Sequence, residues 1–327
     1  MLNPHIFNNQ NYHLILVFFY SLFATYIAAK YLQRKFLTKG FVKTDMYKKN
    51  KNKVADLGGA AALVGVLTAI VLAQIIVSEF STANLLQFYF IIIVHATFGL
   101  LDDLINISNL IKIVAPYFMA IPIVLLVNQT LLTLGPYTID LGYWYVYLIA
   151  PVYLLVVTNL INMHSGYNGL ASGLTWILLL TLGIRSVLFG QTEHLFYLLP
   201  VFGALSILIF FDKYPTKMFW GNIGSMMMGA CVGAYIIISN AEIFGIIILL
   251  PHIFDFFLYL ISVFIKKKKF LKIKFGELRK DGTIKAPTKY KLKFLLPYYF
   301  RLTEKQTTWI LYGITAIFCI LGLAVGV

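Results

Sequence analysis

Polar side chains of the kinds that bind phosphate or metal ions interrupt this apolar sequence near the ends of long apolar segments. Asp102 and Asp103 are adjacent carboxylates, and Asn106 and Lys112 follow them. Adjacent carboxylates at a helix end repel each other, and the arrangement makes sense if they share a proton or a cation. A solvated pair without a special role is the alternative, and the pair alone does not decide between the two.

An amide-rich segment forms the second cluster. Asn159 and Asn162 are three residues apart and share one face of a helix. The run from Gly166 through Asn168 to Gly169 then interrupts that helix. Irregular backbone at membrane depth is tolerated only where it is buried in protein or lines a cavity. Asparagine that hydrogen-bonds between helices is the alternative, but that role requires neither the glycines nor a third asparagine.

The third cluster lies where a loop enters a helix. Lys213 and Lys217 precede the run Gly221-Asn222-Ile-Gly-Ser. Free backbone N–H groups at a helix start, with lysines nearby, form a natural phosphate site, and the Asn222 side chain offers an oxygen to a metal ion. The glycines of this segment also permit close helix packing, and both interpretations can hold together.

The last loop, at about residues 266–306, is strongly basic. Its basic residues include Lys266 to Lys269, Lys272, Lys274, Arg279 and Lys280. His252 and Asp255, in the span before it, share one helix side, and we expect them in the outer half of the membrane, with His252 in a packing role. His164 lies near the amide cluster without an evident partner.

Oxygen ligands dominate these clusters. Carboxylate and amide oxygens suit Mg²⁺, with Mn²⁺ as the alternative, and such an ion commonly bridges protein oxygens and substrate phosphates. An enzyme with these oxygen ligands and a bound divalent cation could join a water-soluble phosphate compound to a lipid phosphate. The lipid would arrive sideways between the spans and the soluble compound from the cytoplasm.

The composition indicates a membrane protein. The 327 residues are 60% hydrophobic and 12% charged, whereas a soluble domain carries roughly 25% charged residues. The apolar residues form continuous blocks of about 17–24 residues, the length of a transmembrane helix, rather than the alternating segments of a β-barrel. We therefore predict an all-α fold: a polytopic membrane helical bundle that forms a single domain over residues 1–327. The expected spans lie at about residues 12–31, 57–77, 85–101, 110–128, 142–161, 169–189, 194–211, 220–239, 242–265 and 307–327.

The charges predict how these ten spans are oriented. The net charge of +14 resides in loops between spans, which argues against nucleic acid as a partner. Lysine and arginine gather after the odd-numbered spans, whereas the loops after the even-numbered spans contain only Arg185. By the positive-inside rule the odd loops are cytoplasmic and both termini lie outside. The polar clusters then face the cytoplasm.

The three blocks, in this order, resemble the polyprenyl-phosphate sugar-1-phosphate transferases of glycosyltransferase family 4, whose ten-span layout is also similar. Within that family the chain looks closest to the dolichyl-phosphate N-acetylglucosamine-1-phosphotransferases. The bacterial peptidoglycan branch has aspartates where this chain has Ser165 and Asn168. The segment Ile139-Asp140-Leu-Gly-Tyr is also similar to the dolichyl branch.

The resemblance implies transfer of N-acetylglucosamine 1-phosphate from UDP-N-acetylglucosamine to a polyprenyl or dolichyl phosphate, with release of UMP. This would be the first step of lipid-linked glycan assembly for protein N-glycosylation. The implied roles are catalysis for Asp102 and Asp103, metal binding for Asn162 and Asn222, and substrate binding for Asn106, Lys112, Asn159, Gly166, Asn168, Phe219, Lys272 and Lys274. In the family, Phe219 corresponds to an aromatic residue that stacks on uracil, and Gly166 with Asn168 to the place where uridine is held.

Two departures from the family pattern leave alternatives open. Asn222 stands where the family usually has a metal-binding aspartate, and the last loop lacks the histidine of the motif that grips the pyrophosphate. Lysine there lacks the bidentate fork of arginine. The alternatives are a membrane transporter or an inactive scaffold relative. The sequence leaves open the sugar, direct or covalent transfer, a homodimer, and whether the membrane is a prokaryotic plasma membrane or the endoplasmic reticulum.

Overall fold

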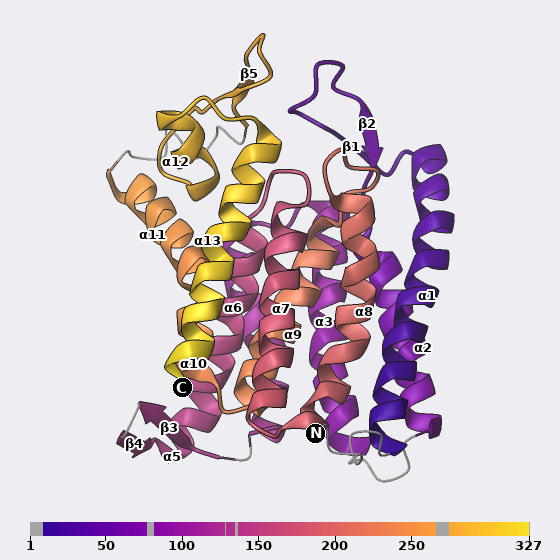
Figure 1. The fold of residues 1–327 in the computed structure, drawn as a ribbon, viewed down its shortest axis with the longest axis vertical. Helices are drawn as coiled ribbons and strands as arrows, with labels where there is room; N and C mark the ends of the chain where they lie inside the picture. Colours follow the sequence, from indigo (N-terminus) through magenta and orange to yellow (C-terminus); the bar gives the residue numbers. More distant parts are fainter. Residues whose placement is uncertain (1–8, 77–81, 128, 135–136, 266–274, 327) are drawn as a thin grey trace, which may run out of the picture.

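A computed structural model describes residues 9–76, 82–127, 129–134, 137–265 and 275–326 (Figure 1). Long helices run side by side along one axis, and short strand pairs lie at the two ends of the bundle. The longer helices are α1 (Asn9–Lys39), α2 (Gly59–Ile76), α3 (Thr82–Ile105), α4 (Asn109–Ala120), α6 (Ala150–Met163), α7 (Leu170–Leu188), α8 (Leu195–Asp212), α9 (Gly221–Ile238), α10 (Glu242–Ile248), α11 (Leu250–Ile265), α12 (Leu292–Tyr299) and α13 (Glu304–Val325).

The prediction of an all-α polytopic membrane bundle is confirmed. Within the described residues, eight helices are long and apolar enough to cross a membrane. The count becomes nine if α10 and α11, which meet at a bend of 67°, form one broken span. Pro251 explains the break, because proline has no N–H to continue the hydrogen bonds of α10 and fits the first turn of α11.

The fourth predicted span, at residues 110–128, is shorter than expected. It consists of α4, which is only 12 residues long, and a 3₁₀ turn, η2 (Ile121–Leu125). Pro122 opens η2 and lacks the N–H that an α-helical hydrogen bond requires, so the chain tightens there. Each of the ten predicted segments therefore contains helix, but length and composition support eight or nine spans among the described residues.

Helix α9 is the core of the bundle. Of its apolar stretch 89% is buried, against 28% for α1 and for α13, which lie at opposite flanks (Figure 1). Its glycines allow this close packing: a Cβ on Gly229 would lie 2.8 Å from Thr158 Cα, and one on Gly233 would lie 2.8 Å from Leu154 Cδ1. The interpretation of these glycines as packing positions therefore holds for the contact between α9 and α6.

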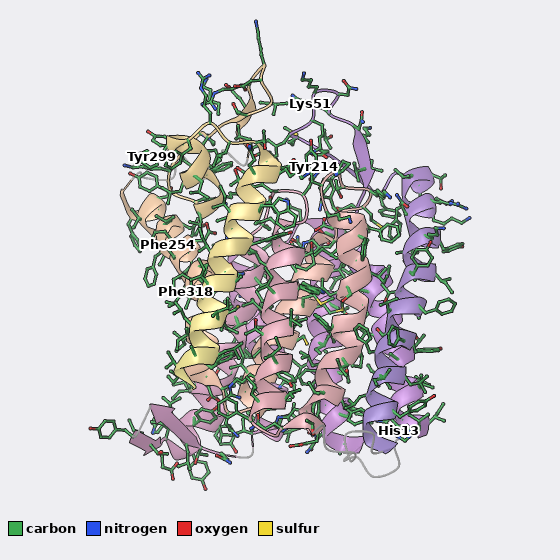
Figure 2. The ribbon with its side chains drawn as sticks, in the orientation of Figure 1. His13, Lys51, Tyr214, Phe254, Tyr299 and Phe318 are labelled. Atoms are coloured by element: carbon green, nitrogen blue, oxygen red, sulfur yellow. The ribbon has the colours of Figure 1, made fainter. Side chains whose placement is uncertain are left out.

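The two ends of the bundle differ. One end carries the hairpin of β1 (Val42–Thr44) and β2 (Lys53–Ala55), the hairpin of β5 (Glu277–Leu278) and β6 (Ile284–Lys285), and α12. Figure 2 shows Lys51 and Tyr214 at this end and His13 at the other. Helix α1 begins and α13 ends at the opposite end, which also carries the hairpin of β3 (Leu131–Leu134) and β4 (Tyr137–Asp140).

Candidate active site

A cavity of about 400 Å³ opens at the end of the bundle that carries the β1–β2 hairpin. Most of its wall comes from three connections that are far apart in the sequence: β1 to α2, α6 to α7, and α8 to α9. Phe275, shortly before β5, completes it. The polar and aromatic residues of the wall include Lys43, Asp45, Asp56, Asn162, Gly166, Asn168, Asp212, Phe219, Asn222 and Phe275. Five of the residues expected from the sequence therefore meet here: Asn162, Gly166, Asn168, Phe219 and Asn222.

The adjacent carboxylates at the end of α3 point to different partners. Asp102 accepts hydrogen bonds from the Asn222 amide at 2.7 Å and from the Ile107 N–H at 2.9 Å, and Lys112 Nζ lies 2.8 Å from its Oδ1. Asp103 accepts a hydrogen bond from the Ile223 N–H at 3.1 Å. Each carboxylate therefore faces a lysine of its own, Asp102 facing Lys112 and Asp103 facing Lys43.

The lysine beside Asp103 is Lys43 of β1, which belongs to the basic segment after the first predicted span. Its ammonium lies 3.1 Å from Asp103 Oδ1 and 2.5 Å from Asp56 Oδ2. Burial lowers the pKa of Lys43, but the charges of Asp56 and Asp103 outweigh it and raise the pKa above its usual range. Asp56 Oδ1 is buried and has no hydrogen-bond partner among the described residues.

Replacing Lys43 by methionine should destabilise the protein, because it leaves two buried carboxylates without their cation. Half of the Lys43 side chain is exposed, which moderates the effect, so we expect the melting temperature in detergent to fall by roughly 2–4 °C. Because the pKa of Lys43 is raised, the stabilisation is fully present below the usual lysine pKa and is lost as the pH rises through the raised pKa. The difference from wild type should therefore persist at pH 9 and decline at higher pH.

The matched control is Lys53→Met, which makes the same change at an exposed lysine of β2. Equal melting curves for the Lys43 variant and wild type at pH 8 would contradict this account of the Lys43 contacts.

A serine joins the two candidate metal-binding asparagines. Ser225 Oγ donates to Asn162 Oδ1 at 2.6 Å and lies 3.2 Å from the backbone oxygen of Asn222. Asn159 instead donates its amide to the Leu155 backbone oxygen of its own helix, at 3.0 Å, and does not line the cavity. Asn106 is exposed in the turn that ends α3.

The start of α9 differs from the open phosphate site that the sequence predicts. The Ile223 N–H in its first turn already donates to Asp103, and Lys213 stacks over the Phe210 ring at 4.4 Å. Gly221 has a φ of 70°, and a Cβ there would lie 2.6 Å from Asp103 Oδ2. The Asp103 carboxylate therefore binds a backbone N–H that was expected to bind phosphate. Only glycine at position 221 leaves room for this carboxylate.

The connection between α6 and α7 is held by acids that the sequence did not single out. Asn168 donates its side-chain amide to Asp45 Oδ2 at 2.9 Å and its backbone N–H to Glu304 Oε1 at 2.7 Å. Lys48 Nζ lies 2.6 Å from Glu304 Oε2 and 3.4 Å from Asp45 Oδ2. The Asn168 amide therefore already has a partner, and the cavity wall is held from the turn after β1 and from α13.

His164 has a neighbour that the sequence did not suggest. Its ring lies 4.7 Å from the ring of His252, nearly perpendicular to it, and both residues are buried. Asp255, one turn further along α11, accepts a hydrogen bond from the Leu292 N–H. His252 and Asp255 thus lie near the end of α6 and not, as expected, in the opposite half of the bundle. That expectation was wrong because it assumed one straight span over residues 242–265. The span instead bends at Leu249, after the seven residues of α10.

The remaining expected residues are placed as follows. Lys112 binds Asp102, as described above, and Lys272 and Lys274 lie outside the described residues. In the part of the chain that the structure describes, no group of three or more histidine, cysteine, aspartate or glutamate side chains could hold a metal ion. A metal ion in this cavity would therefore also need amide oxygens, water or substrate phosphate as ligands.

Comparison with known proteins gives a family match. Residues 85–240 match the model of glycosyl transferase family 4. The chain is 29% identical over 313 residues to a candidate UDP-N-acetylglucosamine–dolichyl-phosphate N-acetylglucosaminephosphotransferase of Saccharolobus solfataricus, covering 92% of this chain and 93% of the relative. It is 27% identical to a candidate of the same name from Sulfolobus acidocaldarius, covering 91% and 92%. A phospho-N-acetylmuramoyl-pentapeptide-transferase of Streptococcus thermophilus is 28% identical over 61% of each chain.

Proposed function

Because residues 85–240 form a glycosyl transferase family 4 domain, we propose that this membrane protein transfers N-acetylglucosamine 1-phosphate from UDP-N-acetylglucosamine to a polyprenyl phosphate of the dolichyl type. The two archaeal relatives that carry this name are matched over more than nine-tenths of both chains. The product, a lipid-linked sugar diphosphate, would begin a glycan for protein N-glycosylation.

One structural observation carries the proposal. The carboxylate pair lies at one end of the bundle, each member facing a lysine, next to a cavity lined by amides and by Phe219. An end position suits a reaction between a soluble nucleotide sugar and a phosphate at the membrane surface. The cavity is large enough to hold a substantial part of a nucleotide, since ligand pockets commonly measure about 300–1,000 Å³.

The reaction requires one phosphorus–oxygen bond to form and one to break. An oxygen of the lipid phosphate attacks the β-phosphorus of the nucleotide sugar, and the bond from that phosphorus to the oxygen bridging to the α-phosphate breaks. The electron pair leaves with that oxygen on UMP. Catalysis of this kind depends on alignment and on neutralising negative charge. Lys43 and Lys112 supply positive charge beside the carboxylates, and Asp103 can orient the lipid phosphate or accept its proton.

We further propose that Mg²⁺ binds among Asp102, Asp103, Asn162 and Asn222. The donor set fits a hard cation, because it consists of carboxylate and amide oxygens. Hydrogen bonds through Ser225 and between Asn222 and Asp102 bring these donors together. The ion would neutralise diphosphate charge when bound. The side chains of the site hold the donors in place and keep Asp103 facing Lys43.

The proposed orientation places the cavity at the cytoplasmic face. The end of the bundle with the cavity carries Lys43, Lys48, Lys49, Lys51 and Lys53 on or beside the β1–β2 hairpin. Basic loops remain on the cytoplasmic side of membranes. Helix α1 begins and α13 ends at the other end, which supports termini on the outer side.

A transfer assay tests the proposal. We expect purified wild-type protein in detergent to release UMP from UDP-N-acetylglucosamine when a short polyprenyl phosphate and Mg²⁺ are both present. Omission of the lipid phosphate, or addition of a chelator, should remove the activity. Release only with another UDP-sugar would retain the reaction and change the donor. No release with any UDP-sugar would contradict the proposed function and favour a scaffold relative.

A further inference from the structure

Lys293 of α12 holds the connection between α6 and α7 in two places, although it lies more than 120 positions away in the sequence. Its side chain is buried, and its ammonium donates to the Ser165 backbone oxygen at 2.7 Å. Its own backbone oxygen accepts a hydrogen bond from the Tyr167 hydroxyl at 2.8 Å. One residue of α12 thus fixes both sides of Gly166, which lines the cavity.

The bond to Ser165 sets the direction of the next amide. The peptide between Ser165 and Gly166 is trans, so its C=O and N–H point in opposite directions. Its oxygen points to Lys293, which is not part of the cavity wall, whereas Ser165 and Gly166 are. The Gly166 N–H therefore points away from Lys293. It has no hydrogen-bond acceptor among the described residues, which leaves it free for a ligand in the cavity that Gly166 lines.

Only glycine fits between Lys293 and the cavity. Gly166 has a φ of 111°, and a Cβ there would lie 2.0 Å from Lys293 Nζ. The ammonium therefore occupies the space where a side chain would otherwise begin. This tight contact fixes the peptide plane and leaves little room for it to rotate.

Lys293 forms no ion pair with the residues that the structure describes. No carboxylate lies within 4 Å of its ammonium in the residues that the structure describes, and the charges that act on it are those of Lys291, Asp255 and Glu304. Burial lowers the pKa of Lys293 to about 7. Below that pH Lys293 is mainly protonated, and its positive charge on the carbonyl side of the peptide then polarises the peptide and strengthens its N–H as a donor.

We propose that Lys293 is a positioning residue for the nucleotide: it fixes the Ser165–Gly166 peptide so that the Gly166 N–H donates to an oxygen of the uridine part of the donor. The inference rests on the proposed function. The lipid phosphate belongs to the opposite side, where Lys112 and the carboxylates of α3 lie. The soluble nucleotide would then bind at the other side of the cavity, which the α6–α7 connection and Phe219 line.

Lys293→Met tests this role, with Lys289→Met as the matched control at an exposed lysine of the same segment. We expect the Lys293 variant to raise the KM for UDP-N-acetylglucosamine and the Ki of UMP in parallel, by about tenfold, since the peptide that carries the Gly166 N–H loses the hydrogen bond to a charged group that holds it in place. The KM for polyprenyl phosphate should stay within twofold, and kcat should change less than the donor KM. The control should match wild type in all four constants.

Two results would overturn the proposal. One is an unchanged donor KM and UMP Ki in a folded Lys293→Met protein; the other is an equal loss in kcat and in both KM values, which indicates a merely structural role. If the methionine variant does not fold, Lys293→Gln, which keeps a hydrogen-bond donor without the charge, is judged by the same criteria with an intermediate shift expected.

Amide hydrogen exchange on the wild-type protein gives a measurement that requires no variant. Adding UMP should slow exchange in the segment that contains Gly166, and absence of this protection would also overturn the proposal. Because UMP binding is measured here without turnover, the result is separable from the transfer assay. A wild-type protein that binds UMP with this protection but releases none from any UDP-sugar would refute the proposed function and leave the role of Lys293 standing.

Discussion

Asp103→Asn should lower kcat for UMP release by about 10²- to 10⁴-fold, the range for removal of a catalytic proton acceptor. The substitution is isosteric and keeps an oxygen that can accept from the Ile223 N–H, which is 3.1 Å from Asp103 Oδ2 in wild type. It removes the charge that faces Lys43 at 3.1 Å. The Asp103→Asn variant should therefore fold and bind both substrates, but it should fail to activate the lipid phosphate. Steady-state UMP release under saturating substrates measures the effect.

The control for this change is Asp140→Asn in β4. Asp140 is also a hydrogen-bonded aspartate, accepting from the Thr130 hydroxyl, but it is exposed and lies at the opposite end of the bundle. The Asp140→Asn substitution should leave kcat unchanged. An Asp103→Asn protein with more than a tenth of wild-type kcat would remove Asp103 from the catalytic step. Exchange of labelled UMP into the nucleotide sugar without lipid would support a covalent aspartyl path over direct attack.

Asn222→Asp should make the protein bind Mg²⁺ more tightly. The Asn222 amide donates to Asp102 Oδ2 at 2.7 Å, and an aspartate there would place two carboxylate oxygens against each other. Without a divalent cation the two charges repel and the melting temperature should fall. With Mg²⁺ the added charge is neutralised, and the Mg²⁺ concentration for half-maximal thermal stabilisation should drop by roughly tenfold, because ligand charge tunes the affinity for such ions. Thermal shift titrations with Mg²⁺ measure this without turnover.

Asn240→Asp provides the matched control, since it introduces the same charge just after the far end of α9. Its Mg²⁺ response should equal that of wild type. A second comparison, Asn222→Ala, removes both the oxygen and the amide and should weaken the Mg²⁺ response. The proposed metal position is wrong if Asn222→Asp loses stability to the same extent with and without Mg²⁺.

The hydropathy of the chain determined the fold class and most of the spans. Apolar blocks of membrane length must form helices, because only helices and closed barrels satisfy their backbone groups in lipid. Hydropathy did not predict two details of the fold: the short α4 with η2, and the bend between α10 and α11. Hydropathy averages over a window, whereas Pro122 and Pro251 act on single hydrogen bonds.

The residue blocks at the span ends predicted part of the site. Asn162, Gly166, Asn168, Phe219 and Asn222 all line one cavity, and they could be found because each lies in a local run that departs from the apolar pattern. Asn159 had the same local signal but bonds to its own helix. Residue type and spacing give the helix face of a side chain, and they do not say which neighbouring helix that face meets.

By itself the sequence determined a membrane bundle, its basic end and the carboxylate and amide blocks, since these follow from local composition and periodicity. Only the tertiary structure decided which charges belong to the site. Lys43 meets Asp103 across 60 positions, Lys48 meets Glu304 across 256, and Lys293 meets Ser165 across 128. In the sequence these lysines are indistinguishable from the solvated charges of the basic loops. Their roles arise from burial and from pairing across distant segments, which depend on how the helices pack and not on the residues beside them in the chain.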